Sequence, residues 1–315
     1  MRKWIIDTDT GSDDAVAIMM AVLSEDIDVL GITAVAGNVP LDLAVKNALM
    51  TLEVCGSPVK VYPGQSRPLF RKPVTAVNVH GDDGMGDRDL IHPVRKAEEE
   101  DAVDFLIRMA KLYGNELEIV MIGPATNIAA AILKDREAMS KIKRLYSMGT
   151  AGFGPGNCTP VSEFNVYADA EAYRIVLEAG IPMTIIGFDM CIGKAAWDME
   201  DMSRISSSGP IGKFAVDCNT ALLNYNIRRA DLSIVDLPDA VAVGVALWPD
   251  IVTDSRHCYC YCHIQDDRCY GQVIVYDPSG ELVIGCPDDP ANADVIAGID
   301  TVLYKQRLEE LLTGH

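Results

Sequence analysis

Apolar residues recur along this chain in two kinds of segment that alternate with one another. Short, nearly continuous apolar runs are typical of strands buried on both faces of a sheet, and they lie at residues 4–7, 29–35, 117–122, 144–148 and 182–187. Runs with helical spacing lie between and after them, at residues 14–23, 41–54, 101–113, 127–133, 170–179, 211–225 and 239–247. This alternation predicts an α/β fold with an open, mostly parallel sheet, a Rossmann-like core and helices on both faces.

The last part of the chain departs from this alternation. Two strand-like runs, 257–264 and 272–277, flank a polar stretch and predict a late hairpin. A charged amphipathic pattern at 301–312 predicts a closing helix. No internal repeat, low-complexity segment or linker interrupts the sequence, so we expect one domain over residues 1–315.

Composition and charge restrict the partners. The 315 residues are 49% hydrophobic and 23% charged, which is enough for a large core. A formal net charge of −19 argues against nucleic acid or an anionic membrane as a partner. No apolar stretch approaches the roughly 18 residues of a membrane span. Since Met1 leads almost directly into the first strand, there is no room for a signal peptide, and we expect a cytoplasmic protein.

Three of the nine cysteines alternate with tyrosines in a strand-like run. Cys258, Cys260 and Cys262 would share one face of a strand. Their spacing lacks the usual two-to-four-residue spacer of a zinc site. We expect reduced, semi-buried thiols, with metal binding or redox sensing, including the nearby Cys269, as the lesser alternative.

One short loop near the amino terminus carries four carboxylates, Asp7, Asp9, Asp13 and Asp14. Like charges this close need a counter-charge, and a hard divalent cation, Ca²⁺ or Mg²⁺, suits an all-oxygen cluster. Gly11 would allow the tight turn that aims the side chains at one point. Helix capping is the alternative explanation. It covers one or two of the carboxylates but leaves the others unexplained.

Other polar loops follow predicted strands. In parallel sheets, ligands bind outside the carboxyl ends of the strands. Besides the acidic loop, polar segments in such positions are 36–38, 79–86, 122–127, 156–165 and 237–240. Each has a structural explanation of its own, such as an N-cap at Asp239 or a helix entry at Asn127. Their number favours a shared site.

The segment DTDTGSDDA at 7–15 resembles the signature of the nucleoside hydrolases, the inosine–uridine-preferring hydrolase family. The resemblance extends in order over nearly the whole chain. Further matching motifs are GN at 37–38, HGDDG at 80–84, GPATN at 123–127, EFN at 163–165, the late hairpin and NADV at 292–295. The acidic loop together with the segment from Asn157 to Asn165 makes the resemblance specific.

The resemblance implies a fold, an activity and a set of site residues. Family members have an open α/β fold, hydrolyse the N-glycosidic bond of ribonucleosides and bind Ca²⁺. The implied metal ligands are Asp9, Asp14, Asp239 and the main-chain carbonyl of Ile122. The implied substrate-binding residues are Asp13, Asn38, His80, Asn157, Glu163 and Asn165. Asp7 would support the loop from behind, and family analogy implies a homodimer or homotetramer.

The expected chemistry suits these residue types. Breaking a ribosyl C–N bond builds positive charge on the sugar, which nearby carboxylates stabilise. Ca²⁺ lowers the pKa of a bound water, and Asp9 would act as the general base. A site that pairs the ribose hydroxyls would reject a 2′-deoxynucleoside. The expected substrate is therefore a purine or pyrimidine ribonucleoside.

The position before the last expected metal ligand departs from the family pattern. Many members have a His there to protonate the leaving base, and purine-preferring members have a Trp, whereas this chain has Pro238. Proline has no titratable group. His80, Tyr225 and Arg228 are the candidates to replace this acid. A substrate with a better leaving group or a weakly active enzyme are the other outcomes.

Two other classes of protein are consistent with part of the sequence. A haloacid dehalogenase-type phosphatase would explain the D-x-D opening at Asp7 and Asp9, with Lys194 as its phosphate-binding lysine. It would leave the loop at 156–165 unexplained. A non-catalytic nucleoside or ribose binder would retain the metal and lack turnover because of Pro238.

Overall fold

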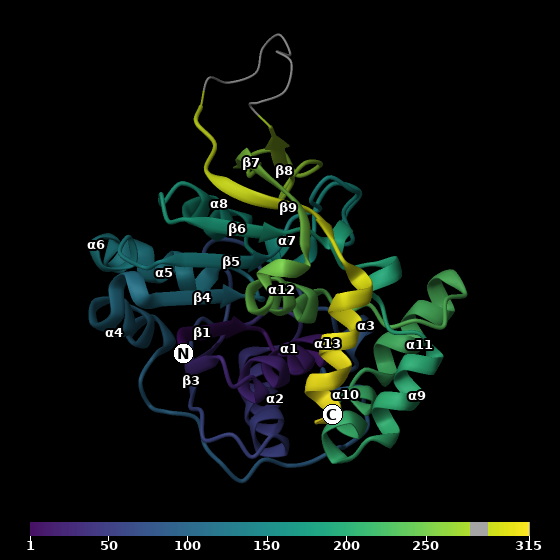
Figure 1. Cartoon of the computed structure of the whole chain (residues 1–315). Coiled ribbons are helices and arrows are strands. Elements are labelled where there is room, and N and C mark those ends of the chain that lie inside the picture. The colour runs from purple at the N-terminus through teal and green to yellow at the C-terminus, as the bar shows by residue number, and fades with distance from the viewer. Residues whose placement is uncertain (278–288, 315) are drawn as a thin grey trace.

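The computed structural model describes residues 1–277 and 289–314 (Figure 1). These residues form a nine-stranded sheet in the order β3-β2-β1-β4-β5-β6-β9-β7-β8. The strands are β1 Arg2–Thr8, β2 Ile27–Ala34, β3 Val61–Pro63, β4 Leu117–Met121, β5 Arg144–Met148, β6 Met183–Ile186, β7 Val252–Cys262, β8 Val273–Tyr276 and β9 Ala293–Ile299.

Most of the sheet is parallel. β1 lies near its middle and pairs in parallel with β2 on one side and β4 on the other. β7 runs antiparallel to both β8 and β9. The open, mostly parallel sheet predicted from the sequence is therefore confirmed, and so is the late hairpin.

Helices cover both faces of the sheet. They are α1 Ser12–Leu23, α2 Leu41–Val54, α3 Val77–His80, α4 Ala102–Tyr113, α5 Thr126–Lys134, α6 Arg136–Met139, α7 Phe164–Ala168, α8 Ala170–Leu177, α9 Met199–Ser207, α10 Pro210–Asp217, α11 Thr220–Ala230, α12 Pro238–Leu247 and α13 Thr301–Thr313. Figure 1 shows α4, α5 and α6 together on one side and α1, α12 and α13 on the other.

Two apolar cores follow from the alternation of side chains along the strands. In β1, Trp4 and Ile6 point into the core that contains α1, α12 and α13. Ile5, between them, points into the core that contains α4, α5 and α8. Since both faces of β1 are buried, its apolar run is nearly continuous, as the sequence pattern indicated.

The structure differs from the sequence prediction at several places, and α9 is among the helices that were not predicted. The helix expected over 211–225 is two helices, α10 and α11, which are separated at Cys218 and Asn219. The strand β9 was not predicted, and it separates β6 from the β7–β8 hairpin. β3 was also missed, because a strand of three residues carries too little pattern to be recognised.

The alternating cysteines behave as the strand pattern predicted. Cys258, Cys260 and Cys262 are all buried on one face of β7. Burial raises the pKa of Cys260 and of Cys262 to about 12, so both remain protonated thiols. Within residues 1–277 and 289–314, no cysteine joins a group that could hold a metal ion. A search of the same residues finds no helix long and apolar enough to cross a membrane.

Candidate metal and ribose site

The acidic loop lies at the carboxyl end of β1, where the chain turns into α1. Thr8 Oγ1 donates a hydrogen bond to Asp14 Oδ1 at 2.6 Å, and the Gly11 N–H donates to Asp14 Oδ2 at 2.8 Å. Both contacts are local, so this part of the sequence contributes to the orientation of Asp14. The carboxylate also lies in the first turn of α1, where the helix dipole favours negative charge.

Gly11 provides room for a close approach, whereas the sequence interpretation was that it allows a tight turn. Its φ of −95° is available to any residue. A Cβ at this position would lie 3.2 Å from Asn38 Nδ2 and 3.2 Å from the His80 ring. The absence of a side chain therefore lets Asn38 and His80 approach the acidic loop.

Asn38, in the loop after β2, connects two of the carboxylates. Its backbone N–H donates to Asp9 Oδ2 at 2.6 Å. Its side-chain Nδ2 donates to Asp14 Oδ2 at 3.1 Å. Asp9 is thus held through one oxygen only. Its Oδ1 is buried and finds no hydrogen-bond donor among the described residues.

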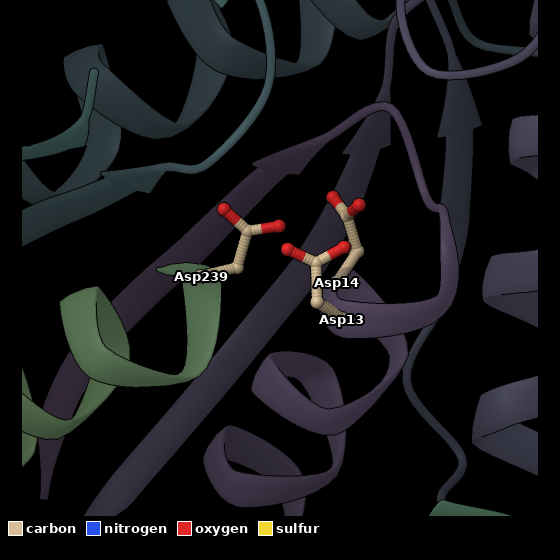
Figure 2. Close-up of side chains that lie close together, drawn as sticks. All are labelled: Asp13, Asp14 and Asp239. Atoms are coloured by element: carbon tan, nitrogen blue, oxygen red, sulfur yellow. The ribbon is translucent and has the colours of Figure 1, made fainter. Parts of the chain in front are cut away.

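Asp13, Asp14 and Asp239 form a compact carboxylate cluster (Figure 2). Each of the three offers an oxygen, and these atoms all lie within 4.8 Å of one another. Asp239 comes from the first turn of α12, so the cluster joins two helix amino termini. The cluster thus combines Asp14 and Asp239, which the resemblance implies for the metal, with Asp13, which it implies for the ribose.

Burial and mutual repulsion make these acids hard to ionise together. Burial raises the pKa of Asp13 and of Asp14 to about 6, and the neighbouring Asp13 further raises that of Asp14. Burial, then repulsion from Asp13, Asp14 and Asp9, raises the pKa of Asp239 well above its usual range. The pKa of Asp9 is raised in the same way, by burial and then by the charge of Asp14.

The donor set fits a hard divalent cation. Asp9 Oδ1 and Asp13 Oδ1 are both buried oxygens that lack a hydrogen-bond donor in the part of the chain that the structure describes. No Lys or Arg in that part forms an ion pair with Asp9, Asp13, Asp14 or Asp239. A cation with several carboxylate oxygens would balance this charge, and it would lower the pKa of each ligand.

His80, the last residue of α3, lies against the cluster. Its Nδ1 is 2.9 Å from Ser12 Oγ and 3.5 Å from Asp13 Oδ1. Burial lowers the pKa of His80 to about 4, although the Asp14 charge opposes this shift. At neutral pH the imidazole is therefore uncharged and can donate only a neutral N–H.

The segment after β5 supplies the amides and the carboxylate predicted for the ribose. Glu163 caps α7, and its carboxylate accepts the N–H groups of Asn165 at 2.9 Å and of Val166 at 3.2 Å. Burial raises the pKa of Glu163 to about 7. Asn157 Oδ1 accepts the Phe164 N–H at 2.9 Å, so Asn157 also braces this segment.

Ile122 and Asn165 are in direct contact. Asn165 Nδ2 donates to the Ile122 carbonyl at 2.8 Å. A carbonyl oxygen has two lone pairs, so Ile122 retains one for another partner. This hydrogen bond fixes the segment after β5 to the end of β4, next to the acidic loop.

Asp7 pairs with neighbouring elements through one carboxylate oxygen, while its Oδ2 is buried and has no hydrogen-bond partner among the described residues. Its Oδ1 accepts Thr33 Oγ1 at 2.5 Å and Asn127 Nδ2 at 2.8 Å. Asn127 also accepts the Gln65 N–H through Oδ1. Asp7 therefore ties β1 to β2 and to the start of α5, and burial raises its pKa to about 7.

Sequence reasoning missed two asparagines that brace the acidic loop. Asn47, in the middle of α2, donates to the carbonyls of Thr10 and Asp83. Asn219, at the break between α10 and α11, donates to the Ser12 carbonyl at 3.2 Å. A polar residue on the buried face of α2 was a usable signal for Asn47, whereas Asn219 carried none.

Besides His80, Tyr225 and Arg228 were the candidates for the acid that protonates the leaving base. Pro238 is the first residue of α12. Tyr225 accepts a hydrogen bond at its hydroxyl from Arg229 Nη1 at 3.0 Å, and Arg228 is exposed. Lys194, the lysine that a phosphatase would need, is also exposed.

Known proteins share this sequence pattern and fold. The family profile described as inosine-uridine preferring nucleoside hydrolase matches residues 4–306. The pyrimidine-specific ribonucleoside hydrolase RihB of Escherichia coli strain SE11 is 33% identical over 316 residues, covering 100% of this chain and 98% of the relative.

Solved structures of similar proteins agree with the fold. The plant nucleoside hydrolase PpNRh1 superimposes with a TM-score of 0.93 at 29% identity, covering 100% of this chain and 99% of the other. A purine-preferring ribonucleoside hydrolase from Gardnerella vaginalis superimposes with a TM-score of 0.90 at 32% identity, covering 99% and 98%. One of these relatives is named as pyrimidine-specific and another as purine-preferring.

Proposed function

Because the chain belongs to the inosine-uridine preferring nucleoside hydrolase family, we propose that it hydrolyses the N-glycosidic bond of ribonucleosides with Ca²⁺ held by its acidic loop. The family establishes an N-glycosyl hydrolase, as the sequence predicted, and makes the phosphatase alternative wrong. The observation that carries the rest of the proposal is the buried carboxylate cluster beside the unpaired oxygen of Asp9.

The proposed ligands are those expected from the family resemblance. Asp14 and Asp239 belong to the compact cluster, and Asp9 and the Ile122 carbonyl each retain an oxygen lone pair for a cation. When bound, Ca²⁺ would supply charge stabilisation and lower the pKa of water at the site. Asp13 lies close enough to share in holding the cation or to bind a ribose hydroxyl beside it.

Asp9 is suited to accept the proton of the attacking water. Asn38 anchors Oδ2, and Oδ1 remains without a donor in the described chain, so one oxygen is fixed while the other faces a reactant. Burial and the neighbouring Asp14 raise the pKa of Asp9 in the metal-free site, and a bound cation would lower it, so that the carboxylate is ionised and able to accept a proton. A positioned base of this kind contributes roughly 10²–10⁴-fold to rate.

The remaining polar groups would hold the ribose. Asp13, Asn157, Glu163 and Asn165 are proposed to bind its hydroxyls, with Asn38 and His80 supporting the acidic loop. Buried carboxylates next to the sugar also stabilise the positive charge that develops on its ring. Removing a hydroxyl would leave such groups unpaired, which a polar site rejects strongly.

The leaving base receives little help from a charged acid. Pro238 carries no proton, and the lowered pKa of His80 leaves its ring neutral at pH 7. We therefore propose that the enzyme favours nucleosides whose base departs readily. Such a preference would not follow the division into purine and pyrimidine nucleosides that the names of the relatives give.

The test is release of reducing sugar from inosine, adenosine, guanosine, uridine and cytidine. We expect release that disappears after Ca²⁺ removal, returns when Ca²⁺ is restored, and falls roughly 10²–10⁴-fold in Asp9→Asn. Asp101→Asn is the matched control, since Asp101 caps α4 on the opposite face of the sheet. Nucleoside binding without sugar release would instead indicate the binding-only alternative.

Family analogy also leads us to expect a homodimer or homotetramer, which light scattering would test.

A further inference from the structure

The substrate segment at 156–165 rests against a distant part of the chain. Residues 263–272 connect β7 to β8, and we call them the β7–β8 turn. Ser162 and Gln272 form an antiparallel bridge outside the main sheet. Gly271 has a φ of +75°, and a Cβ there would lie 2.4 Å from Ser162 Oγ and 3.0 Å from Tyr167 Cα. The turn therefore contacts the chain on both sides of Glu163.

Tyr270 strengthens the same contact. Its ring is buried and meets the Tyr167 ring edge to face, with centroids 5.6 Å apart at 83°. Its hydroxyl donates to the Glu171 carboxylate and accepts the Ala170 N–H. Tyr167 belongs to α7, the helix that Glu163 caps, so Tyr270 holds that helix against α8.

Arg71 covers the outer face of Tyr270. Its guanidinium carbon lies 3.5 Å from the centre of the Tyr270 ring. Nη1 donates to Asp267 Oδ1 at 2.9 Å, and Nε lies 3.8 Å from Glu171 Oε1. Arg71 thus joins the loop after β3 to two elements of the β7–β8 contact, the turn itself and α8.

We propose that the β7–β8 turn positions Glu163 and Asn165 for the ribose, with Tyr270 as the positioning residue and Arg71 as the latch that holds it. The inference rests on the proposed function, because it assigns ribose binding to Glu163 and Asn165. The polar groups of the segment 156–165 pair largely within the segment, at Gly156, Cys158 and Thr159. Its placement therefore depends on neighbours, and the turn is the neighbour on the side of Ser162.

Two backbone amides report directly on this placement. The N–H groups of Asn165 and Val166 donate to the Glu163 carboxylate, so their hydrogen exchange measures whether Glu163 stays in place. In Arg71→Ala we expect these two amides to exchange ~5-fold faster, the size expected for loss of a partly exposed cation–π contact. Because the ribose hydroxyl contacts act in both ground and transition states, KM for uridine should rise by a similar factor, and kcat should fall only as far as the displaced Glu163 carboxylate stabilises charge on the ring.

Arg268→Ala is the matched control. Arg268 lies on the same turn, but its exposed side chain pairs only with Asp266 among the residues described. This variant should leave both amides and KM at wild-type values. Gly271→Ala, which would push the turn away from Ser162 and Tyr167, should exceed the effect of Arg71→Ala.

Three results would overturn the inference. The first is wild-type exchange of both amides in Arg71→Ala and Gly271→Ala. The second is faster exchange spread over the whole chain with a lowered melting temperature. The third is a KM rise equal in the Arg268→Ala control. If the wild-type protein releases no sugar, the proposed function fails, while exchange at Asn165 and Val166 still decides the positioning by the turn.

Discussion

Adding one methyl group at Gly37 should disable the site without unfolding the protein. Gly37 lies in the loop after β2, directly against Asp9. A Cβ there would lie 2.1 Å from Asp9 Oδ2 and 2.8 Å from Pro124 Cδ. Ordinary van der Waals contact begins at 3.4 Å, so the methyl group and the carboxylate oxygen must separate by 1.3 Å.

Either way of relieving this contact damages the same geometry. If Asp9 moves, its Oδ2 leaves the Asn38 N–H that now lies at 2.6 Å. If the loop moves, Asn38 moves with it and loses its contact with Asp14 as well. A misplacement of about 1 Å in a catalytic group lowers rate by roughly 10²-fold. Loss of one hydrogen bond to a charged group costs about 1.5–3 kcal/mol of stability.

The assay is sugar release from the best nucleoside substrate, together with thermal unfolding. Gly37→Ala should lose roughly 10²-fold in kcat/KM while retaining a cooperative melting transition. Gly56→Ala is the control, because a Cβ there meets nothing within 4 Å. Its left-handed φ of +62° should cost about 1–2 kcal/mol and leave the rate unchanged. A Gly37→Ala enzyme with wild-type kcat/KM would refute the placement of Asp9 in the catalytic geometry.

Three further predictions concern the cation, the sugar and the imidazole. Without Ca²⁺, burial keeps the pKa of Asp13 and of Asp14 at about 6, so the native state retains protons that the unfolded chain releases near pH 4. The free energy of unfolding should therefore fall by about 3 kcal/mol per carboxyl as pH rises from about 4 to about 6, and Ca²⁺ should abolish the fall. Calorimetry across this pH range, with Ca²⁺ and with a chelator, measures the difference. Matching profiles under the two conditions would contradict the prediction. Uridine should exceed 2′-deoxyuridine by roughly 10⁴-fold in kcat/KM, and equal turnover would remove the proposed hydroxyl contacts. Since burial lowers the pKa of His80 to about 4, His80→Gln should leave the shape of the pH–rate profile unchanged between about pH 6 and 8. If a change in rate centred near pH 6.5 disappears in this variant, the imidazole is charged in the wild-type enzyme instead.

Most of the sheet was readable from the sequence because its strands are buried on both faces. The apolar runs at 144–148 and 41–54 coincide residue for residue with β5 and α2. β9 was missed because a strand is defined by its partners. β9 pairs with β6 on one side and with β7 on the other, and no local sequence pattern predicts this pairing. At the break between α10 and α11, Asn219 likewise donates to the distant Ser12 carbonyl, a contact that no local pattern predicts.

In the candidate site, too, some features could be predicted from the sequence and others depend on the fold. The acidic loop was recognisable from the sequence, since four carboxylates within eight residues require a counter-charge. Thr8 and Gly11 supply local hydrogen bonds to Asp14. Folding brings an oxygen of each of Asp13, Asp14 and Asp239 within 4.8 Å of the others, and it places Asn38 where it connects Asp9 to Asp14.

The protonation states also belong to the tertiary structure. A sequence gives His80 an ordinary imidazole and Glu163 an ordinary carboxyl, whereas burial moves their pKa values in opposite directions, to about 4 and about 7. The amino-acid sequence establishes which groups are available and which backbone segments carry them. Their distances and charges came from the fold, because both depend on which distant segments exclude water from the site.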